Sequence, residues 1–254
     1  MIYILGGKGF IGSAFVRWCQ ANQKKYVCIT RENYQLFTST NCEILINANG
    51  NSSKPRAAKD QIFDFEASVV SVKKSISDFK PAIYVYLSSC DVYPDCSNPE
   101  STREDQPIDI TRQSVYGFHK WLAEQCVQHD CPKWLIFRMG GFVGPGLKKN
   151  AIFDIIHDSP LWLDSESELQ YMSTDTLAAC VMDLAFKKIV NEIYNICGQD
   201  TVRLKDIMDR VNYTGRVTSH SPKAKYQVSI QKLLTQRQIP FSKDEVFLYV
   251  DNPA

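Results

Sequence analysis

Residues 1–12 read MIYILGGKGFIG, and this stretch decides the fold. The apolar run of residues 2–5 has the length and the composition of a buried β-strand. It stops at a glycine-rich turn, and a helical stretch is expected over residues 11–21. A strand, a glycine turn and a helix in this order predict the opening unit of a phosphate-binding α/β fold.

The turn contains Gly6, Gly9 and Gly12, which are three residues apart rather than in the G-x-G-x-x-G order of the commonest dinucleotide fingerprint. Gly6 and Gly9 let the backbone turn tightly and approach a pyrophosphate. The N-terminus of the helix, at Phe10 and Ile11, then faces the charge of that group. Gly12 removes a side chain where the helix meets the strand. The alternative is a glycine-rich turn that holds no ligand.

Short apolar runs alternate with longer amphipathic stretches along most of the chain. Buried strands are expected at residues 2–5, 26–29, 43–46, 83–87, 134–137 and 193–196. Helices are expected at residues 11–21, 57–79, 116–129 and 174–189. Strict alternation of strand and helix predicts a Rossmann-type α/β fold, a doubly wound parallel sheet covered by helices on both faces. Such sheets bind ligands beyond the carboxyl ends of their strands.

The periodicity weakens in two places, and this suggests a division of the chain. Residues 1–145, completed by about 172–197, are expected to form the dinucleotide-binding Rossmann domain. Residues 146–171 and 198–254 are expected to form a small C-terminal substrate-binding lobe. The length of 254 residues suits one large domain or a domain with an appendage.

Composition excludes several other classes of protein. Lys and Arg number 29 against 28 Asp and Glu, so the formal charge of +1 provides no basic field for nucleic acid. No apolar run approaches the ~18 residues of a membrane span, and the N-terminal run is too short for a signal peptide. The nine cysteines show no zinc or redox spacing, so no metal is expected and the compartment is expected to be reducing and cytoplasmic.

The end of the second strand bears on the choice of cofactor. NAD sites usually place a carboxylate there for the ribose hydroxyls, but this chain has Thr30 and Arg31, with Glu32 one position late. A guanidinium can bind a 2′-phosphate through two hydrogen bonds, so NADP is favoured over NAD. The alternative is that Arg31 is solvated and Glu32 binds the ribose.

Three residues suit proton transfer to or from a substrate oxygen. Tyr116 and Lys120 are four residues apart, so they share one face of the expected helix. The ammonium of Lys120 is expected to favour the phenolate and to hold ribose hydroxyls of the nicotinamide cofactor. Ser89, at the end of a strand, can hydrogen-bond the oxygen that becomes a carbonyl. Together they predict a proton relay for hydride transfer at a carbinol carbon.

These motifs, in this order, resemble those of the extended short-chain dehydrogenase/reductases of the NAD-dependent epimerase/dehydratase family. The resemblance extends from Met1 to about Gly198 and includes the stretch from Arg138 to Pro145, Asp175 and Asn195. It implies that Ser89, Tyr116 and Lys120 are the catalytic triad and that the substrate is a small molecule, a nucleotide-linked sugar.

The resemblance adds further cofactor residues and a mode of assembly. It implies that Asn47, Ala48 and Asn49 lie beside the cofactor, where the family has an Ala-Ala turn. It also suggests a homodimer formed through the helix containing Tyr116 and the helix at residues 57–79, with Trp121 and Phe118 giving apolar area. The catalytic Tyr116 and Lys120 are expected to contact the cofactor as well.

Departures from the family pattern bear on the reaction. Gly141 stands where the family usually has an asparagine that contacts the substrate. Cys90 replaces the acid of the sugar-nucleotide 4,6-dehydratases, which argues against dehydration. Asp91 could be the acid/base of an epimerase at C3 or C5 of a keto-sugar, or a capping carboxylate of the turn.

The sequence therefore predicts an NAD(P)-dependent oxidoreductase that acts on a nucleotide-linked sugar as a 4-keto reductase or an epimerase. Two alternatives remain: a reductase of a non-sugar carbonyl, and a non-catalytic NAD(P)-binding regulatory or scaffold protein. An intact Ser89, Tyr116 and Lys120 argues against the second alternative, because a binding protein does not need a proton relay.

Overall fold

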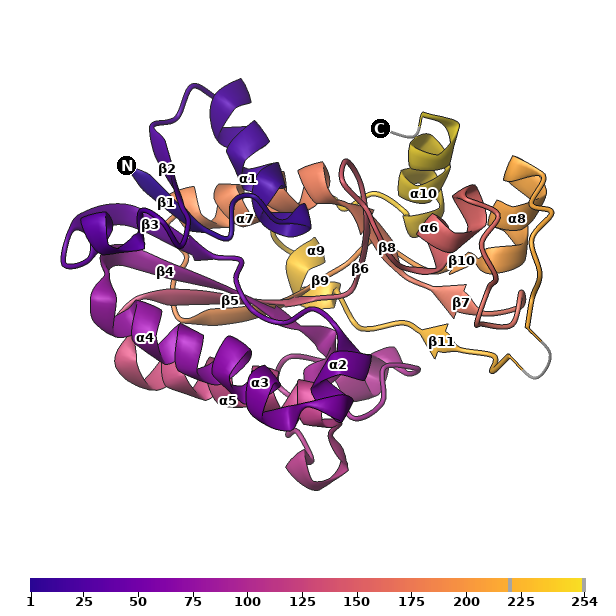
Figure 1. Ribbon diagram of the computed structural model, residues 1–254, viewed down its shortest axis with the longest axis horizontal. Helices are drawn as coiled ribbons and strands as arrows, with labels where there is room; N and C mark the ends of the chain where they lie inside the picture. Colours follow the sequence, from indigo (N-terminus) through magenta and orange to yellow (C-terminus); the bar gives the residue numbers. More distant parts are fainter. Residues whose placement is uncertain (219–220, 253–254) are drawn as a thin grey trace. The chain divides into compact units, whose positions relative to one another are not determined.

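The computed structural model describes residues 1–218 and 221–252 (Figure 1). The chain divides into two compact units. The first unit contains residues 1–94, 107–139 and 178–194, and the second contains residues 95–106, 140–177 and 195–254. In the part of the chain that the structure describes, no helix combines the length and the apolar character needed to cross a membrane.

A six-stranded sheet forms the centre of the first unit, with the strand order β2-β1-β3-β4-β5-β9. Its strands are β1 (Ile2–Leu5), β2 (Tyr26–Ile29), β3 (Asn41–Asn47), β4 (Lys80–Ser89), β5 (Trp134–Met139) and β9 (Glu192–Ile196). β1 pairs in parallel with both β2 and β3, and β3, β4 and β5 continue in parallel. The strand order reverses at β1, which places a switch point between β1 and β3. The predicted Rossmann-type fold is thus confirmed.

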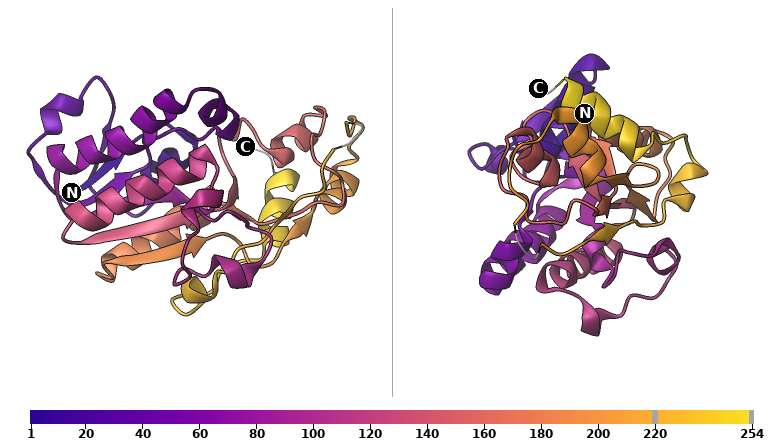
Figure 2. Two further views of the ribbon diagram at one scale, coloured as in Figure 1. Left: turned by 90° about the horizontal axis from the view of Figure 1, so that it is seen from below. Right: turned by 90° about the vertical axis from the view of Figure 1, so that its right-hand side faces the viewer.

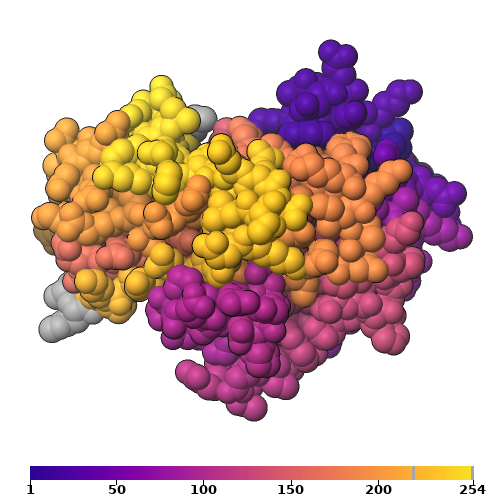
Figure 3. Space-filling model, turned by 180° about the vertical axis from the view of Figure 1, so that it is seen from behind, coloured from indigo at the N-terminus to yellow at the C-terminus, as the bar shows by residue number. Residues whose placement is uncertain are grey.

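Helices cover both faces of this sheet. α1 (Phe10–Ala21) and α7 (Thr174–Phe186) lie on one face, and α4 (Ser71–Asp78) and α5 (Val115–Asp130) lie side by side on the other (Figures 1 and 2). Trp18 of α1 stacks on Phe186 of α7 at 5.9 Å between ring centroids. From behind, the orange surface of α7 adjoins the indigo N-terminal segments (Figure 3).

Strand periodicity divides the core between the two faces of the sheet. Alternate residues of β1, Tyr3 and Leu5, pack toward α4 and α5 in a cluster that includes Val72 of α4 and Val127 of α5. Because side chains alternate along a strand, the intervening residues of β1 serve the opposite face. Burial of both faces explains why the strands read as continuous apolar runs rather than as alternating ones.

The single helix expected at residues 57–79 is broken into several pieces. The structure has α2 (Lys54–Lys59), α3 (Gln61–Phe65), a π-helical turn (Glu66–Val70) and then α4. Asp60 interrupts the helix with a non-helical backbone (φ −137°, ψ 86°), and its carboxylate accepts a hydrogen bond from the amide of Phe63. Asp60 is thus the N-cap of a new helix, α3. Because a helix continues directly after the break, the helical periodicity of the sequence alone did not reveal it.

The second unit is built from short elements. Its strands are β6 (Gly141–Val143), β7 (Glu168–Leu169), β8 (Tyr171–Ser173), β10 (Val202–Arg203) and β11 (Lys225–Tyr226). Its helices are α6 (Ala151–Ile156), α8 (Leu204–Val211), α9 (Gln231–Leu234) and α10 (Ser242–Asp251). The strands form two sheets, β10-β7-β11 and β6-β8.

Residues 95–106 belong to the second unit, although the sequence suggested a first domain that runs unbroken to residue 145. The reason is the buried Asn195, whose amide donates to the carbonyl oxygens of Thr102 at 2.6 Å and Ser229 at 2.8 Å. The backbone amide of Asn195 donates to the carboxylate of Glu104. These contacts join chain segments that are distant in sequence.

Candidate active site

The glycine turn lies at the switch point of the sheet. Gly6 has a φ of +78°, and a Cβ atom there would lie 2.6 Å from Asn49 Oδ1. A Cβ at Gly12 would lie 2.1 Å from the carbonyl oxygen of Gly6, so the helix packs against the turn with no room for a side chain. Both glycines are therefore required by conformation or by space.

The N-terminus of α1 is open to an anion. Its N-cap residue is Gly9, no side chain caps the helix, and its first turn carries no acidic residue. The amide of Ser13 already donates to the carbonyl of Gly9, which leaves the amides of Phe10, Ile11 and Gly12 at the helix start. Free amides at the positive end of a helix suit a pyrophosphate.

The turn after β3 lies against the glycine turn, because a Cβ at Gly6 would lie 2.6 Å from Asn49 Oδ1 and 2.9 Å from the carbonyl oxygen of Ala48. The side chain of Asn47 points into the fold instead, where it donates to Tyr84 Oη at 2.7 Å and to Ser75 Oγ at 3.2 Å. Asn47 Oδ1 also accepts from the backbone amide of Asn49 at 3.0 Å. Asn47 thus shapes the turn that carries Ala48 and Asn49.

Arg31 and Glu32 are both exposed in the turn that follows β2. A hydrogen bond with the side chain of Thr30 lowers the pKa of Glu32, with smaller contributions from the cations Lys8 and Arg31. Glu32 and Arg31 therefore share this turn, with Lys8 of the glycine turn close enough to act on Glu32, so the residues for either cofactor, NAD or NADP, are present.

Ser89, Tyr116 and Lys120 come together beside the carboxyl end of β4, and all three are buried. The Ser89 side chain acts on the hydroxyl group of Tyr116 and lowers its pKa. Lys120 Nζ lies 5.7 Å from the ring centroid of Tyr116 and 5.7 Å from that of Tyr86. Helix α5 presents Tyr116 and Lys120 on one face because they are one turn apart. Ser114 caps this helix by accepting the amide of Gly117.

Burial dominates the electrostatics of this group. It raises the pKa of Tyr116, with a further rise from Asp91, and the Ser89 side chain opposes that shift. The direction is opposite to the one expected from a neighbouring ammonium, because the ring is only 8% exposed. Burial also lowers the pKa of Lys120 to about 8, although nearby carboxylates raise it. Tyr116 is therefore a neutral phenol at neutral pH.

Asp91 lies beside Ser89, and its carboxylate has two side-chain partners. Its Oδ2 accepts a hydrogen bond from Ser89 Oγ at 3.0 Å, and its Oδ1 lies 2.6 Å from Lys54 Nζ of α2. The backbone amide of Asp91 donates in turn to Ser89 Oγ at 3.2 Å. Asp91 thus both caps its turn and presents a charge beside Ser89.

Sequence reasoning missed a buried ion pair behind the site. Arg138 Nη2 lies 2.8 Å from Glu124 Oε2, and Glu124 Oε1 also accepts from Ser88 Oγ at 2.6 Å. Arg138 Nη1 donates to Tyr93 Oη at 2.8 Å. The signal was present, because Glu124 follows Lys120 by four residues and so shares its helix face.

A second group was also missed, in which Asp64 and His119 meet in the interior at 2.7 Å between Oδ2 and Nδ1. Cys90 is buried, and its thiol donates to the carbonyl oxygen of Arg138, as a packed thiol would. In the described residues no group of three or more His, Cys, Asp or Glu side chains could hold a metal ion.

Gly141 departs from the family pattern for a steric reason. A Cβ atom there would lie 2.6 Å from the carbonyl oxygen of Gln170 and 2.7 Å from Tyr171 Cδ1. No side chain fits at this position, so an asparagine contact of the kind found in the family is absent from this chain.

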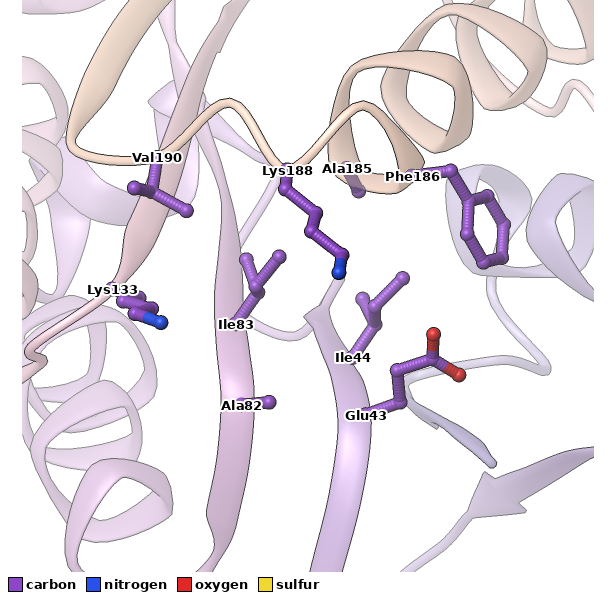
Figure 4. A pocket seen from close by; sticks show the side chains of 9 residues that line it. All are labelled: Glu43, Ile44, Ala82, Ile83, Lys133, Ala185, Phe186, Lys188 and Val190. Atoms are coloured by element: carbon purple, nitrogen blue, oxygen red, sulfur yellow. The ribbon is translucent and has the colours of Figure 1, made fainter.

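A separate hollow of about 240 Å³ lies at the amino ends of β3 and β4 (Figure 4). Residues of both strands, Lys133 and the end of α7 line it, and the side chain of Lys188 reaches toward Ile44 and Ile83 (Figure 4). Since ligands of parallel sheets bind at the carboxyl ends, this hollow lies at the other edge. None of the predicted site residues line it.

A parallel sheet with a glycine turn at its switch point, and a Tyr–Lys pair on the following helix, define a dinucleotide-binding protein of the short-chain dehydrogenase/reductase type. The chain belongs to the NAD dependent epimerase/dehydratase family, whose sequence model matches residues 2–197. The resemblance inferred from the sequence is therefore confirmed. No curated protein sequence matches the chain.

Solved structures share the fold at low sequence identity. The dTDP-4-dehydrorhamnose reductase of Bacillus anthracis, solved with NADP, has a TM-score of 0.82 and 15% identity, with 100% of this chain and 99% of that chain covered. The UDP-glucuronic acid 4-epimerase of Bacillus cereus, solved with a substrate analogue and NAD, has a TM-score of 0.76 and 16% identity, with 100% and 99% covered. MoeE5, solved with UDP-glucose and NAD, has a TM-score of 0.80 and 12% identity, with 98% and 97% covered.

Proposed function

We propose that this protein is an NAD(P)-dependent oxidoreductase that reduces a keto group, at C4, of a nucleotide-linked sugar. The observation that carries the proposal is the convergence of Ser89, Tyr116 and Lys120 in one buried group at the carboxyl end of β4. Family membership gives the class of reaction, and the proteins of similar fold that are solved with nucleotide sugars support the substrate class.

The residues present fit a nicotinamide dinucleotide. The uncapped start of α1 has amides for a pyrophosphate. Lys120 is 4% exposed, and among the described residues its ammonium has no hydrogen bond or ion pair, as expected of a group that binds ribose hydroxyls. Ala48 and Asn49 would border the cofactor at the switch point, and Arg31 would bind the 2′-phosphate of NADP. When bound, the nicotinamide supplies the hydride.

The state of Tyr116 favours the reductive direction. A neutral phenol can donate its proton to the substrate oxygen as negative charge develops there, and its raised pKa keeps that proton available at neutral pH. Ser89 would orient the same oxygen through its hydroxyl group. Lys120 would stabilise the phenolate that Tyr116 leaves behind.

An epimerase remains the second candidate, and one observation favours it. Asp91 is a carboxylate that touches Ser89, so it lies near enough to the proposed substrate oxygen to exchange a proton at a neighbouring carbon. Its ion pair with Lys54 opposes this role, because a paired carboxylate is a weaker base.

Calorimetry with NADPH and NADH, followed by turnover assays on nucleoside-diphosphate 4-keto-sugars, tests the proposal. The Gly9→Ala variant tests whether the cofactor binds at the glycine turn. Gly9 has φ −80° and ψ 169°, which alanine can adopt, and a Cβ there would lie 3.2 Å from the carbonyl oxygen of Gly6, so the fold should tolerate it after a shift of a few tenths of an ångström. The added methyl group would enter the expected pyrophosphate site and lower affinity about tenfold or more. Absence of binding of either cofactor to the wild-type protein would contradict the proposal.

A further inference from the structure

Asp64 is the centre of a buried polar cluster that joins four segments of the first unit. The side chain is fully buried on α3, and its Oδ2 lies 2.7 Å from His119 Nδ1 of α5. Its Oδ1 accepts from Asn51 Nδ2 at 2.8 Å, in the loop after β3, and from Ser68 Oγ at 3.5 Å, in the π-helical turn. A buried carboxylate with three donors is firmly held.

The chain neighbours of this cluster surround the head group of Lys120. His119 precedes Lys120 in α5. Gly50 precedes Asn51, and a Cβ at Gly50 would lie 3.2 Å from Lys120 Nζ, 3.6 Å from the carbonyl oxygen of Ala67 and 4.0 Å from Ser68 Oγ. The segments that Asp64 ties together therefore form the wall against which the ammonium of Lys120 lies.

Three carboxylates influence Lys120, and two of them already have a cationic partner. Glu124, on α5, pairs with Arg138, and Asp91, in the turn after β4, pairs with Lys54. Asp64 has only neutral donors and His119; no Lys or Arg lies within ion-pair distance of it in the described part of the chain. The remaining titratable groups that face Lys120 are the phenols of Tyr86 and Tyr116.

Tyr86 lies beside the ammonium of Lys120 and adds no charge to its surroundings. This side chain is fully buried on β4, and its hydroxyl has no hydrogen-bond partner among the described residues. An unpartnered phenol contributes no charge that could stabilise Lys120. The negative charge of Asp64 is therefore the one not already balanced by a Lys or Arg.

We propose that Asp64, held in place by His119, is a positioning residue that keeps Lys120 in its ammonium form and fixes the wall on which it rests. The inference rests on the role of Lys120 in the proposed function, since only an ammonium can both hold ribose hydroxyls and stabilise the phenolate of Tyr116. Asp64 acts through Lys120 and does not itself touch the substrate.

The effects on the pKa of Lys120 agree with the position of Asp64. Burial lowers the pKa of Lys120 to about 8, and among the charges that oppose this shift Asp64 has the largest effect, ahead of Glu124 and Asp91. Loss of the Asp64 charge should lower this pKa further, so that Lys120 becomes neutral at a pH where the wild-type protein keeps it charged.

A titration of Lys120 in the full-length protein without cofactor tests the proposal. Lysine labelled with ¹³C at Cε reports protonation by NMR, and the Lys120→Met variant identifies the signal. Asp64→Asn keeps the shape of the side chain and removes its charge, so the Lys120 midpoint should fall by on the order of one pH unit. An unchanged midpoint in a folded Asp64→Asn protein would overturn the proposal.

His119→Gln separates the effect of the Asp64 charge from the effect of packing around it. This variant also provides the test if Asp64→Asn does not fold. It retains the Asp64 carboxylate and offers it an amide donor, so the Lys120 midpoint should stay in place or rise. A fall as large as that expected for Asp64→Asn would overturn the proposal. His129→Gln is the matched control, because His129 also lies 2.7 Å from an aspartate on α5, but on the surface.

Cofactor affinity gives a second readout. Asp64→Asn should weaken NADPH binding about fivefold at pH 8, because the charged fraction of Lys120 falls from about one half to about one tenth, and by less than about twofold at pH 6, where Lys120 is charged in both proteins. Equal weakening at both values would indicate a merely structural role and overturn the proposal. The NMR titration needs neither cofactor nor substrate, so failure of the proposed function would leave its result unaffected.

Discussion

Ser89 Oγ donates a hydrogen bond to Asp91 Oδ2 at 3.0 Å, so the hydroxyl that should orient the substrate oxygen is engaged by a carboxylate. Asp91 is in turn held by Lys54 at 2.6 Å. A substrate oxygen that binds Ser89 would have to share or replace this contact. The chemistry of Asp91 therefore decides between the two sugar reactions considered above.

Asp91→Asn distinguishes a reductase from an epimerase. For a reductase, the variant should keep turnover within about tenfold, because the amide can still accept from Ser89 and no proton is taken from carbon. For an epimerase, incorporation of solvent deuterium beside the keto group should vanish while hydride transfer survives. Mass spectrometry of the sugar product in D₂O measures this. We expect no carbon-bound deuterium from solvent, and exchange that disappears in Asp91→Asn would assign epimerisation instead.

Arg31→Leu tests the preference for NADP. If the guanidinium binds the 2′-phosphate through charge-assisted hydrogen bonds, its loss should weaken NADPH binding by at least about tenfold and leave NADH binding unchanged. Calorimetry on both cofactors gives the ratio. Arg112→Leu, in the turn Ile110–Arg112, is a suitable control for the loss of one positive charge. An equal effect on both cofactors would contradict a role at the 2′-phosphate.

Glu124→Gln should destabilise the fold strongly. The variant leaves Arg138 buried without its anionic partner, and breaking a buried ion pair in this way costs on the order of 3 kcal/mol. Urea unfolding followed by circular dichroism measures the change. The exposed pair Lys187–Asp183, with 2.9 Å between Nζ and Oδ2, supplies the control, since Asp183→Asn should cost less than about 0.5 kcal/mol. Similar costs for both variants would contradict the burial argument.

The sequence predicted the parts of the site that depend on local spacing. Strand ends locate Ser89, and the four-residue interval of a helix brings Tyr116 and Lys120 onto one face, so both could be foreseen. Asp64 and His119 could not, because they are 55 residues apart and meet only through the packing of α3 on α5. The rise in the pKa of Tyr116 could not be predicted either, because it depends on how deeply the ring is buried.

The homodimer remains a prediction, and the surface of the first unit suggests where to test it. Ile62, Phe65 and Val70 are 72%, 38% and 46% exposed on α3 and the π-helical turn, close to the helices that the sequence suggested for pairing. Val70→Lys should weaken a dimer formed there, because it places a charge in an apolar contact. Light scattering measures the mass, and Leu248→Lys on α10 is the control. A monomeric wild-type protein at micromolar concentration would contradict the prediction.

Tyr116→Phe tests the central claim most directly, because it removes one proton and keeps the ring. The measurement is transfer of deuterium from NADPH, deuterated at its hydride position, to a nucleoside-diphosphate 4-keto-sugar. The wild-type protein should place deuterium on the sugar. In Tyr116→Phe the rate should fall by ~10²–10⁴-fold, while calorimetry shows cofactor affinity nearly unchanged. Deuterium transfer at the wild-type rate in Tyr116→Phe would contradict the account.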